Sequence, residues 1–198
     1  MPALTFSDFE PWLVPELSGV PLFTIKNHLS VVVQEFCQRS KCVTVTVAKD
    51  LKVDGSDFPA LMTDDKVIYE LERCELDGAS VSLLDEFDNS GRTSIKINDE
   101  KIGFSVLNPK NGKQLKALFT VSSKRNATLF PEELEYWIDG IVSGVLARLK
   151  IMPDKPWSNS AQAGFHFAQY NQAISKARAR TLVNQSAGNL KLQPVPFI

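Results

Sequence analysis

The sequence predicts an α+β fold: a small helical bundle built from both ends of the chain, with an inserted antiparallel β-sandwich or barrel. Near both ends, apolar residues recur at three- and four-residue steps, the spacing of one helix face. Between them, short runs alternate apolar and polar residues as half-buried strands do, and turn residues separate these runs. The chain has 198 residues, 43% of them hydrophobic, which is enough for one core with one large insertion.

Residues 1–40 are predicted to form an extended arm followed by the first helix of the bundle. Prolines in the first twenty residues disfavour a regular helix there, because proline lacks a backbone N–H and restricts the residue before it. These are Pro2, Pro11 and Pro15. The helix is expected from Pro21 to about Ser40. Its apolar face comprises Leu22, Ile25, Leu29, Val32, Val33 and Phe36.

Residues 41–128 are predicted to form the inserted β domain. Turn signals such as Asp77-Gly78 and Asn108–Gly112 separate its strand-like runs. Several short strands at close spacing are typical of an antiparallel sandwich or barrel. The expected strands are 42–47, 67–71, 81–84, 93–97, 103–106 and 115–121.

Residues 129–183 are predicted to contain two more helices, of which the first begins at Pro131, a favoured first-turn position. Gly140 and Gly144 lie one turn apart on this helix. Each glycine costs about 1 kcal/mol relative to alanine in a helix interior. We therefore expect that another backbone approaches this helix closely.

The last helix is expected from about Ser160 to Val183, with Ser158 or Asn159 as its N-cap. It carries apolar or small residues on two faces, which predicts two neighbours. One face has Ala161, Phe165 and Ala168, and the other has Ala163, Phe167, Tyr170, Ile174 and Ala177. The remaining residues, 184–198, are expected to form an extended tail, because they contain Gly188, Pro194 and Pro196.

Charge is distributed unevenly along a chain whose net charge is only −1. The segment 50–88 holds twelve acidic and three basic residues, a net charge of −9, whereas 155–198 holds five basic residues and no acid. These segments either dock against charged neighbours or form ordinary solvated faces. Lys176, Arg178 and Arg180 alternate along the last helix and so splay around it, which argues against a DNA-reading face.

The sequence has no feature of a secreted or membrane protein. Cys37, Cys42 and Cys74 show no paired spacing, which favours free thiols in a reducing cytoplasm, with Cys37 buried on a helix face. The first nine residues lack the pattern of a signal peptide. No apolar run reaches the roughly 18 residues of a membrane span.

No pattern in the sequence can be assigned to catalysis. His28 and His166 are its only histidines; His28 is expected to be a boundary residue, and His166 a packing or interface residue. The motifs of hydrolases, nucleotide-binding proteins and zinc enzymes are absent. The run Asp85–Gly91 is similar to the start of a calcium loop, but Lys96 stands where the closing glutamate belongs. We therefore expect no enzymatic activity, no cofactor and no metal site.

Several segments at the two ends of the chain resemble head–tail adaptor (neck) proteins of tailed bacteriophages. The resemblance covers about half of the chain, and the middle matches in character only. Its segments are Trp12-Leu13-Val14-Pro15-Glu16-Leu17-Ser18-Gly19-Val20-Pro21; Gln34-Glu35-Phe36-Cys37-Gln38-Arg39-Ser40; the helix from Tyr136 to Leu149, which ends in Ala147-Arg148-Leu149; the turn Met152-Pro153-Asp154-Lys155-Pro156-Trp157-Ser158; and the last-helix segment from Gln169 to Arg180.

This resemblance implies a structural role in the virion neck, with assembly in the cytoplasm of the bacterial host. Such proteins form a ring, usually twelvefold, beneath the portal; they link capsid to tail and continue the DNA channel without reading its sequence. The implied partners are the portal, tail or further neck proteins, and other copies of the chain. Adaptor tails dock onto the portal, and the matching residues are Leu190, Leu192, Pro194, Val195, Pro196, Phe197 and Ile198. The expected subunit-interface residues are Gly140, Gly144, Trp157, Phe165, Phe167 and Tyr170.

Three other functions stay open from the sequence. A tail-completion or tail-terminator protein would also form a ring, but on the tail side of the neck. A small enzyme with its active site in the β domain would need a nucleophile or base that the sequence does not reveal. A carbohydrate-binding sandwich is disfavoured, because Trp12, Trp137 and Trp157 lie outside the predicted strands.

Overall fold

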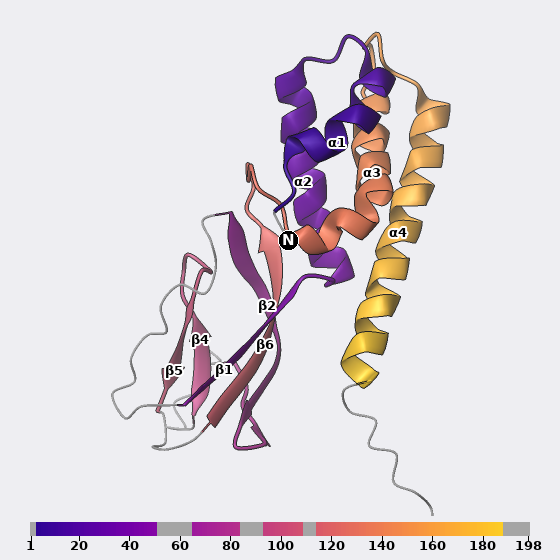
Figure 1. Cartoon of the computed structure of the whole chain (residues 1–198). Helices are drawn as coiled ribbons and strands as arrows, with labels where there is room; N and C mark the ends of the chain where they lie inside the picture. Colours follow the sequence, from indigo (N-terminus) through magenta and orange to yellow (C-terminus); the bar gives the residue numbers. More distant parts are fainter. Residues whose placement is uncertain (1–2, 51–64, 84–92, 109–113, 188–198) are drawn as a thin grey trace, which may run out of the picture.

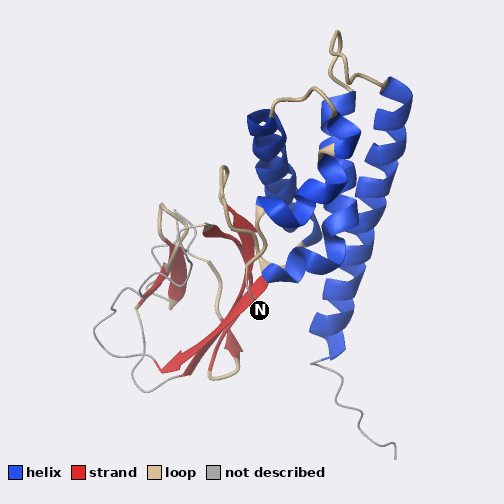
Figure 2. Ribbon diagram, turned by 45° about the horizontal axis from the view of Figure 1, so that its top comes forward, coloured by secondary structure: helices blue, strands red, loops and turns tan. Residues whose placement is uncertain are grey.

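The computed structural model describes residues 3–50, 65–83, 93–108 and 114–187 (Figure 1). Its helical part comes from both ends of the chain, and its strands come from the middle. Figure 2 shows the helices gathered on one side and the strands on the other. The prediction of an α+β fold with antiparallel strands is therefore confirmed.

The helical part contains four α-helices and two short 3-10 helices in the described residues. The long helix α2 ends at Ser40, and Lys41 follows it with a left-handed backbone at φ 55°. That conformation stops the helix and turns the chain into the first strand. The helical elements are α1 (Phe6–Leu13), η1 (Pro15–Leu17), α2 (Leu22–Ser40), η2 (Glu132–Trp137), α3 (Ile138–Lys150) and α4 (Ser160–Ala187).

Within the described residues, the strands form one sheet of four, in the order β1-β6-β2-β3, and one sheet of two, β4-β5. All strand pairs are antiparallel. The rings of Phe104 in β5 and Phe119 in β6 lie 4.9 Å apart, so the small sheet packs on the large one. Whether the two sheets complete a sandwich or a barrel stays a prediction. The strands are β1 (Thr44–Asp50), β2 (Lys66–Leu76), β3 (Ala79–Ser80), β4 (Ser94–Ile97), β5 (Phe104–Leu107) and β6 (Gln114–Ser123).

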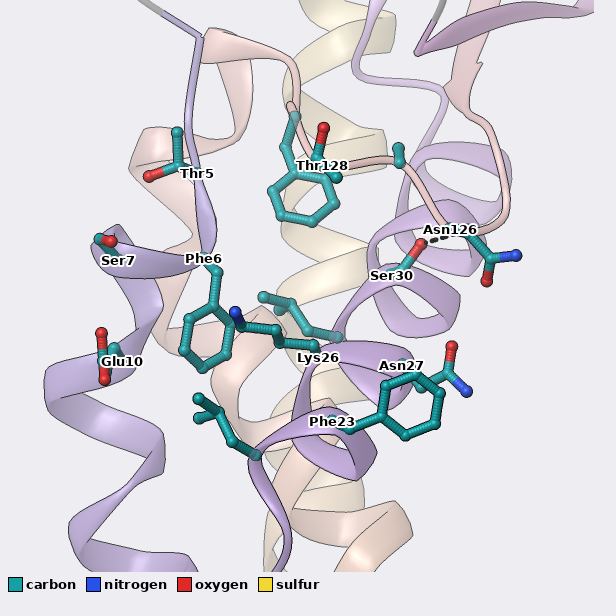
Figure 3. Close-up of a pocket in the computed structure, with 14 residues that line it drawn as sticks. Thr5, Phe6, Ser7, Glu10, Phe23, Lys26, Asn27, Ser30, Asn126 and Thr128 are labelled. Atoms are coloured by element: carbon teal, nitrogen blue, oxygen red, sulfur yellow. Dashed lines mark hydrogen bonds between the residues drawn. The ribbon is translucent and has the colours of Figure 1, made fainter.

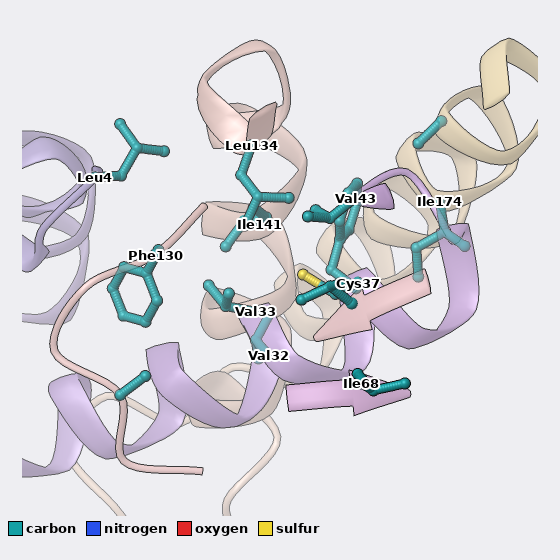
Figure 4. Packing of buried hydrophobic residues seen from close by; sticks show 14 of the residues in the cluster. Leu4, Val32, Val33, Cys37, Val43, Ile68, Phe130, Leu134, Ile141 and Ile174 are labelled. Carbon is teal, nitrogen blue, oxygen red and sulfur yellow. The ribbon is translucent and has the colours of Figure 1, made fainter. Parts of the chain in front are cut away.

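One cluster of buried apolar side chains joins the helices to the large sheet (Figure 4). Cys37 of α2, Val43 before β1 and Ile68 of β2 all belong to it and are almost fully buried. The prediction that Cys37 is a buried thiol is confirmed, and burial raises its pKa, so that it stays uncharged. Hydrogen bonds also cross this boundary: the Asn126 N–H donates to the Ser30 hydroxyl at 2.8 Å.

The predicted extended arm is wrong, because residues 6–13 form α1. The Asp8 carboxylate accepts hydrogen bonds from the Thr5 N–H at 2.6 Å and from the Thr5 hydroxyl at 3.0 Å, which fixes the start of the helix. Phe9 and Leu13, one turn apart, are fully buried. Burying these two side chains contributes about 3–6 kcal/mol in total, which is enough to offset the roughly 3 kcal/mol that an interior proline costs. Pro11 is therefore tolerated inside this short helix.

The helix predicted from Pro131 has two parts. Residues Glu132–Trp137 form the 3-10 helix η2, and the α-helix α3 starts only at Ile138. Within η2 and the start of α3, Leu134 and Ile141 are fully buried, whereas Tyr136 is 73% exposed. The tighter 3-10 turn gives the chain a different side-chain register before α3 begins.

Candidate subunit interface on the last helix

The last helix begins with a defined cap. The Gln162 N–H donates to the Asn159 side-chain oxygen at 3.1 Å, so of the two predicted caps Asn159 is the one that caps α4. The preceding turn is closed by the Ser158 N–H, which donates to the Lys155 carbonyl at 2.9 Å. This turn and cap reverse the chain after α3 and lay α4 along its side (Figure 1).

The inner face of α4 is filled by the chain's own helices. Ala163, Tyr170, Ile174 and Ala177 are all at most 5% exposed. The Tyr170 hydroxyl donates to the Val32 carbonyl of α2 at 3.2 Å, and burial raises the pKa of this hydroxyl. These four residues belong to the second of the two predicted apolar faces, which therefore packs against the chain's own helices. Phe167 was assigned to the same face, but it is 57% exposed.

The two glycines of α3 allow this close packing. A Cβ atom added to Gly140 would lie 2.4 Å from the Ala173 Cβ, and one added to Gly144 would lie 2.7 Å from both the Tyr170 ring and the Val32 side chain. The predicted close neighbour is therefore present, and it belongs to the same chain. The expectation of a subunit interface at Gly140, Gly144 and Tyr170 needs correction, because α2 and α4 already occupy the space around them.

The outward side of α4 carries a second stripe of mostly small and apolar residues at helical spacing. We call it the outer stripe, and all of its members are exposed. Phe165 is its largest side chain and is 61% exposed. A helix that is apolar on two sides is typical of one that packs against two neighbours. The stripe consists of Ala161, Phe165, Ala168, Gln172, Ser175, Ala179 and Val183.

Two predicted interface residues remain: Phe167, which lies within α4, and Trp157, which lies in the turn before it. Phe167 is exposed and available for contact. Trp157 is half-buried at the turn before α4, and its indole nitrogen is buried without a hydrogen-bond partner in the described structure. An unpaired buried donor costs about 1–3 kcal/mol, so a partner carbonyl or carboxylate beside it would be favourable.

Charged residues of the segments that carry the resemblance lock the three long helices together. Glu35 of α2 forms ion pairs with Arg39 at 2.9 Å and with Arg148 of α3. Arg39 also donates to the Asn171 side chain of α4 at 2.7 Å. These groups are partly exposed, so each pair adds little stability alone. Their main effect is to fix the relative positions of α2, α3 and α4.

A second polar contact ties the N-terminal lead to the start of α4. The Lys150 ammonium is nearly buried and donates to Glu16 at 2.8 Å and to Gln162 at 2.7 Å. The hydrogen bond and the charge of Lys150 lower the pKa of Glu16. Sequence reasoning missed this contact, because the lysine and its acid lie far apart in the chain and an acid before a proline-rich turn gives no pairing signal.

Both histidines are half-buried, and both should make folding sensitive to acid. Burial is the main cause that lowers the pKa of His28 and of His166 from 6.5, with nearby Arg148 and Lys150 adding to it respectively. The protonated form is therefore disfavoured in the folded state, and the unfolded chain binds more protons. Stability is complete above pH 6.5 and is lost as the pH falls through the lower, folded pKa values.

We expect the free energy of unfolding to fall between about pH 7 and pH 5. The double variant His28→Gln, His166→Gln should show a flatter profile over this range, as measured by urea denaturation at each pH. The single variant Gln169→Ala serves as the control, because it changes an exposed residue of α4 that does not titrate. Equal slopes in the wild type and the double histidine variant would contradict the assignment.

Other predicted features lie outside the described residues. These include the calcium-like run 85–91 and the portal-binding residues 190–198. Within the parts of the chain that the structure does describe, no group of three His, Cys, Asp or Glu side chains could hold a metal ion. In the same parts, no helix combines the length and the apolar character needed to cross a membrane.

Comparison with known proteins does not assign the chain to a family: no protein-family model matches it, and no curated protein matches it.

Proposed function

We propose that this chain is a structural subunit of a phage neck, a head–tail adaptor that forms a ring beneath the portal and links the capsid to the tail. In this role it has no enzymatic activity, and DNA passes through the ring without sequence-specific contacts. The portal, a tail or neck protein and further copies of the chain are its partners. It assembles in the bacterial cytoplasm and resides in the virion.

The observation that carries the proposal is the outer stripe of α4. Its inner face is already filled by α2 and α3, yet its outward side exposes Phe165 and Val183, 61% and 65% exposed, without a single acidic residue along the helix. Such a surface is expected of a subunit that packs side by side with others in an assembly. In an isolated monomer this face would meet water, and such a face normally carries charged or polar residues.

The segments that carry the resemblance add a second line of support, because they meet in space. Glu35 pairs with Arg148, and Arg39 of the same segment as Glu35 donates to Asn171, so three of these segments are joined directly. Lys150, which directly follows the segment from Tyr136 to Leu149, binds Glu16 of a fourth segment. The residues that resemble adaptor sequences thus serve one common purpose, the fixed arrangement of the bundle.

Electron microscopy of the purified chain with the portal encoded in the same genome tests the proposal. We expect a twelvefold ring on the portal, and weaker co-sedimentation after deletion of residues 190–198. A sixfold ring that binds the tail end instead would support the runner-up, a tail-completion or tail-terminator protein. A chain that binds neither portal nor tail would contradict both functions.

A further inference from the structure

An open cavity of about 750 Å³ lies between α1, α2 and the loop 126–130 (Figure 3). Phe6, Leu22 and Phe23 give it an apolar lining. Phe23 is 76% exposed and Leu22 is 46% exposed, so the described residues leave these side chains without a cover. Burying them against a partner would contribute about 1.5–3 kcal/mol for each side chain.

The cavity and the outer stripe lie on different sides of the helical part. Figure 3 shows the α4 ribbon behind the cavity, and Figure 1 shows α1 and α2 on one side of α3 with α4 on the other. On the outer stripe, Phe165 stands between Ala161 and Ala168, each about one turn away. Phe165 is the largest apolar side chain of the outer stripe and is 61% exposed, so its ring is available to a partner.

The helices that carry the two surfaces have opposite net charges. Helix α1, one wall of the cavity, carries Asp8 and Glu10 and no basic residue. Helix α4 carries Lys176, Arg178 and Arg180 and no acidic residue. Among the described residues, the cavity lining itself carries one acid, Glu10, and one lysine, Lys26, whose ammonium lies 5.0 Å from the Phe6 ring centroid. The opposite net charges of α1 and α4 favour the approach of α4 of one copy to α1 of another and disfavour the approach of α4 to α4.

We propose that Phe165 of one copy enters the cavity between α1 and α2 of the next copy, so that copies associate head to tail. The inference rests on the proposed function, because it names the surfaces by which the ring would form. A contact between two different surfaces of the same chain is heterologous, and repeated copies of it close into a ring when the rotation allows. A self-complementary contact through α4 alone would stop at a dimer.

Two variants test the two sides of this contact, the Phe165 side chain and the cavity, one at a time. Phe165→Asp removes the projecting side chain, and Phe23→Asp places a charge at the cavity. Both residues are exposed, so both variants should fold as the wild type does. Tyr69→Asp on β2 is the matched control, because Tyr69 is also an exposed aromatic residue, at 42%, but lies in the sheet.

Native mass spectrometry over a concentration series gives the readout. We expect the wild type and Tyr69→Asp to form oligomers, and each interface variant to associate at least ~30-fold more weakly, as for the central residue of an interface. Mixing the two interface variants should restore a one-to-one dimer, because each retains the half that the other lacks. A mixture that stays monomeric, variants that associate as the wild type does, or a wild type that is monomeric throughout would overturn the contact.

The contact and the proposed function can fail separately. If Phe165→Asp still forms a twelvefold ring on the portal, the adaptor function stands and the head-to-tail contact is wrong. If the mixed variants form the expected dimer but the wild type binds no portal, the contact stands and the adaptor function is wrong.

Discussion

Replacing Phe36 by alanine is expected to lower the free energy of unfolding by about 3–5 kcal/mol. Phe36 is fully buried where α2, η2 and α4 meet. Its ring centroid lies 6.1 Å from that of Trp137 and 6.1 Å from that of Tyr170. The change removes the apolar burial and leaves a cavity whose walls come from three helices, which cannot all collapse inward at once.

This loss is a large part of the roughly 5–15 kcal/mol by which a domain of ordinary stability stays folded. The measurement is urea denaturation, followed by circular dichroism. Phe23→Ala is the matched control on the same helix: Phe23 is 76% exposed, so its replacement should change the stability of the monomer by no more than about 0.5 kcal/mol. A loss below about 1 kcal/mol for Phe36→Ala would mean that the three helices do not share this core.

The long helices and strands were predictable because apolar residues recur along each of them at the spacing of its own secondary structure. Helix α2 runs from Leu22 to Ser40, where the apolar spacing placed it. Each of the expected strands overlaps an observed strand, except that the strand at 81–84 is displaced to Ala79–Ser80, with Leu83 in an isolated bridge to Ile95. The prediction for the N-terminal segment was wrong, because a local sequence signal there differs from the long-range contacts that decide its structure. Its prolines are a strong local signal, whereas the burial of Phe9 and Leu13 depends on contacts with distant residues.

The candidate interface was predictable only in part. Helical spacing predicted the face of α4 that carries Phe165, and this side chain is exposed in the structure. Spacing cannot tell which of two apolar faces meets the chain itself, and so Tyr170 was assigned to a neighbour that is in fact α2. The cavity beside Phe23 could not be predicted, because it exists only once α1 has formed and packed beside α2.

Replacing Gly140 by alanine is expected to lower the free energy of unfolding by about 1–2 kcal/mol. The added Cβ would lie 2.4 Å from the Ala173 Cβ, which is fixed to its own backbone, so α3 and α4 must move apart. Overpacking of this kind costs about 1–3 kcal/mol, and the better helix propensity of alanine returns up to about 1 kcal/mol. Gly144→Ala should behave similarly, because the Tyr170 ring that it meets is held by its hydrogen bond to Val32.

Gly164→Ala on α4 is the control, because a Cβ there meets nothing within 4 Å. It should stabilise the protein by up to about 1 kcal/mol through helix propensity alone. Thermal unfolding of the three single variants in dilute solution, where copies do not associate, measures the intramolecular effect. If Gly140 and Gly144 instead faced another subunit, all three variants would gain stability as monomers and only oligomer formation would suffer. Opposite signs for Gly140→Ala and Gly164→Ala therefore place the glycines in the contact between α3 and α4 and leave the outer stripe as the surface for a neighbouring copy.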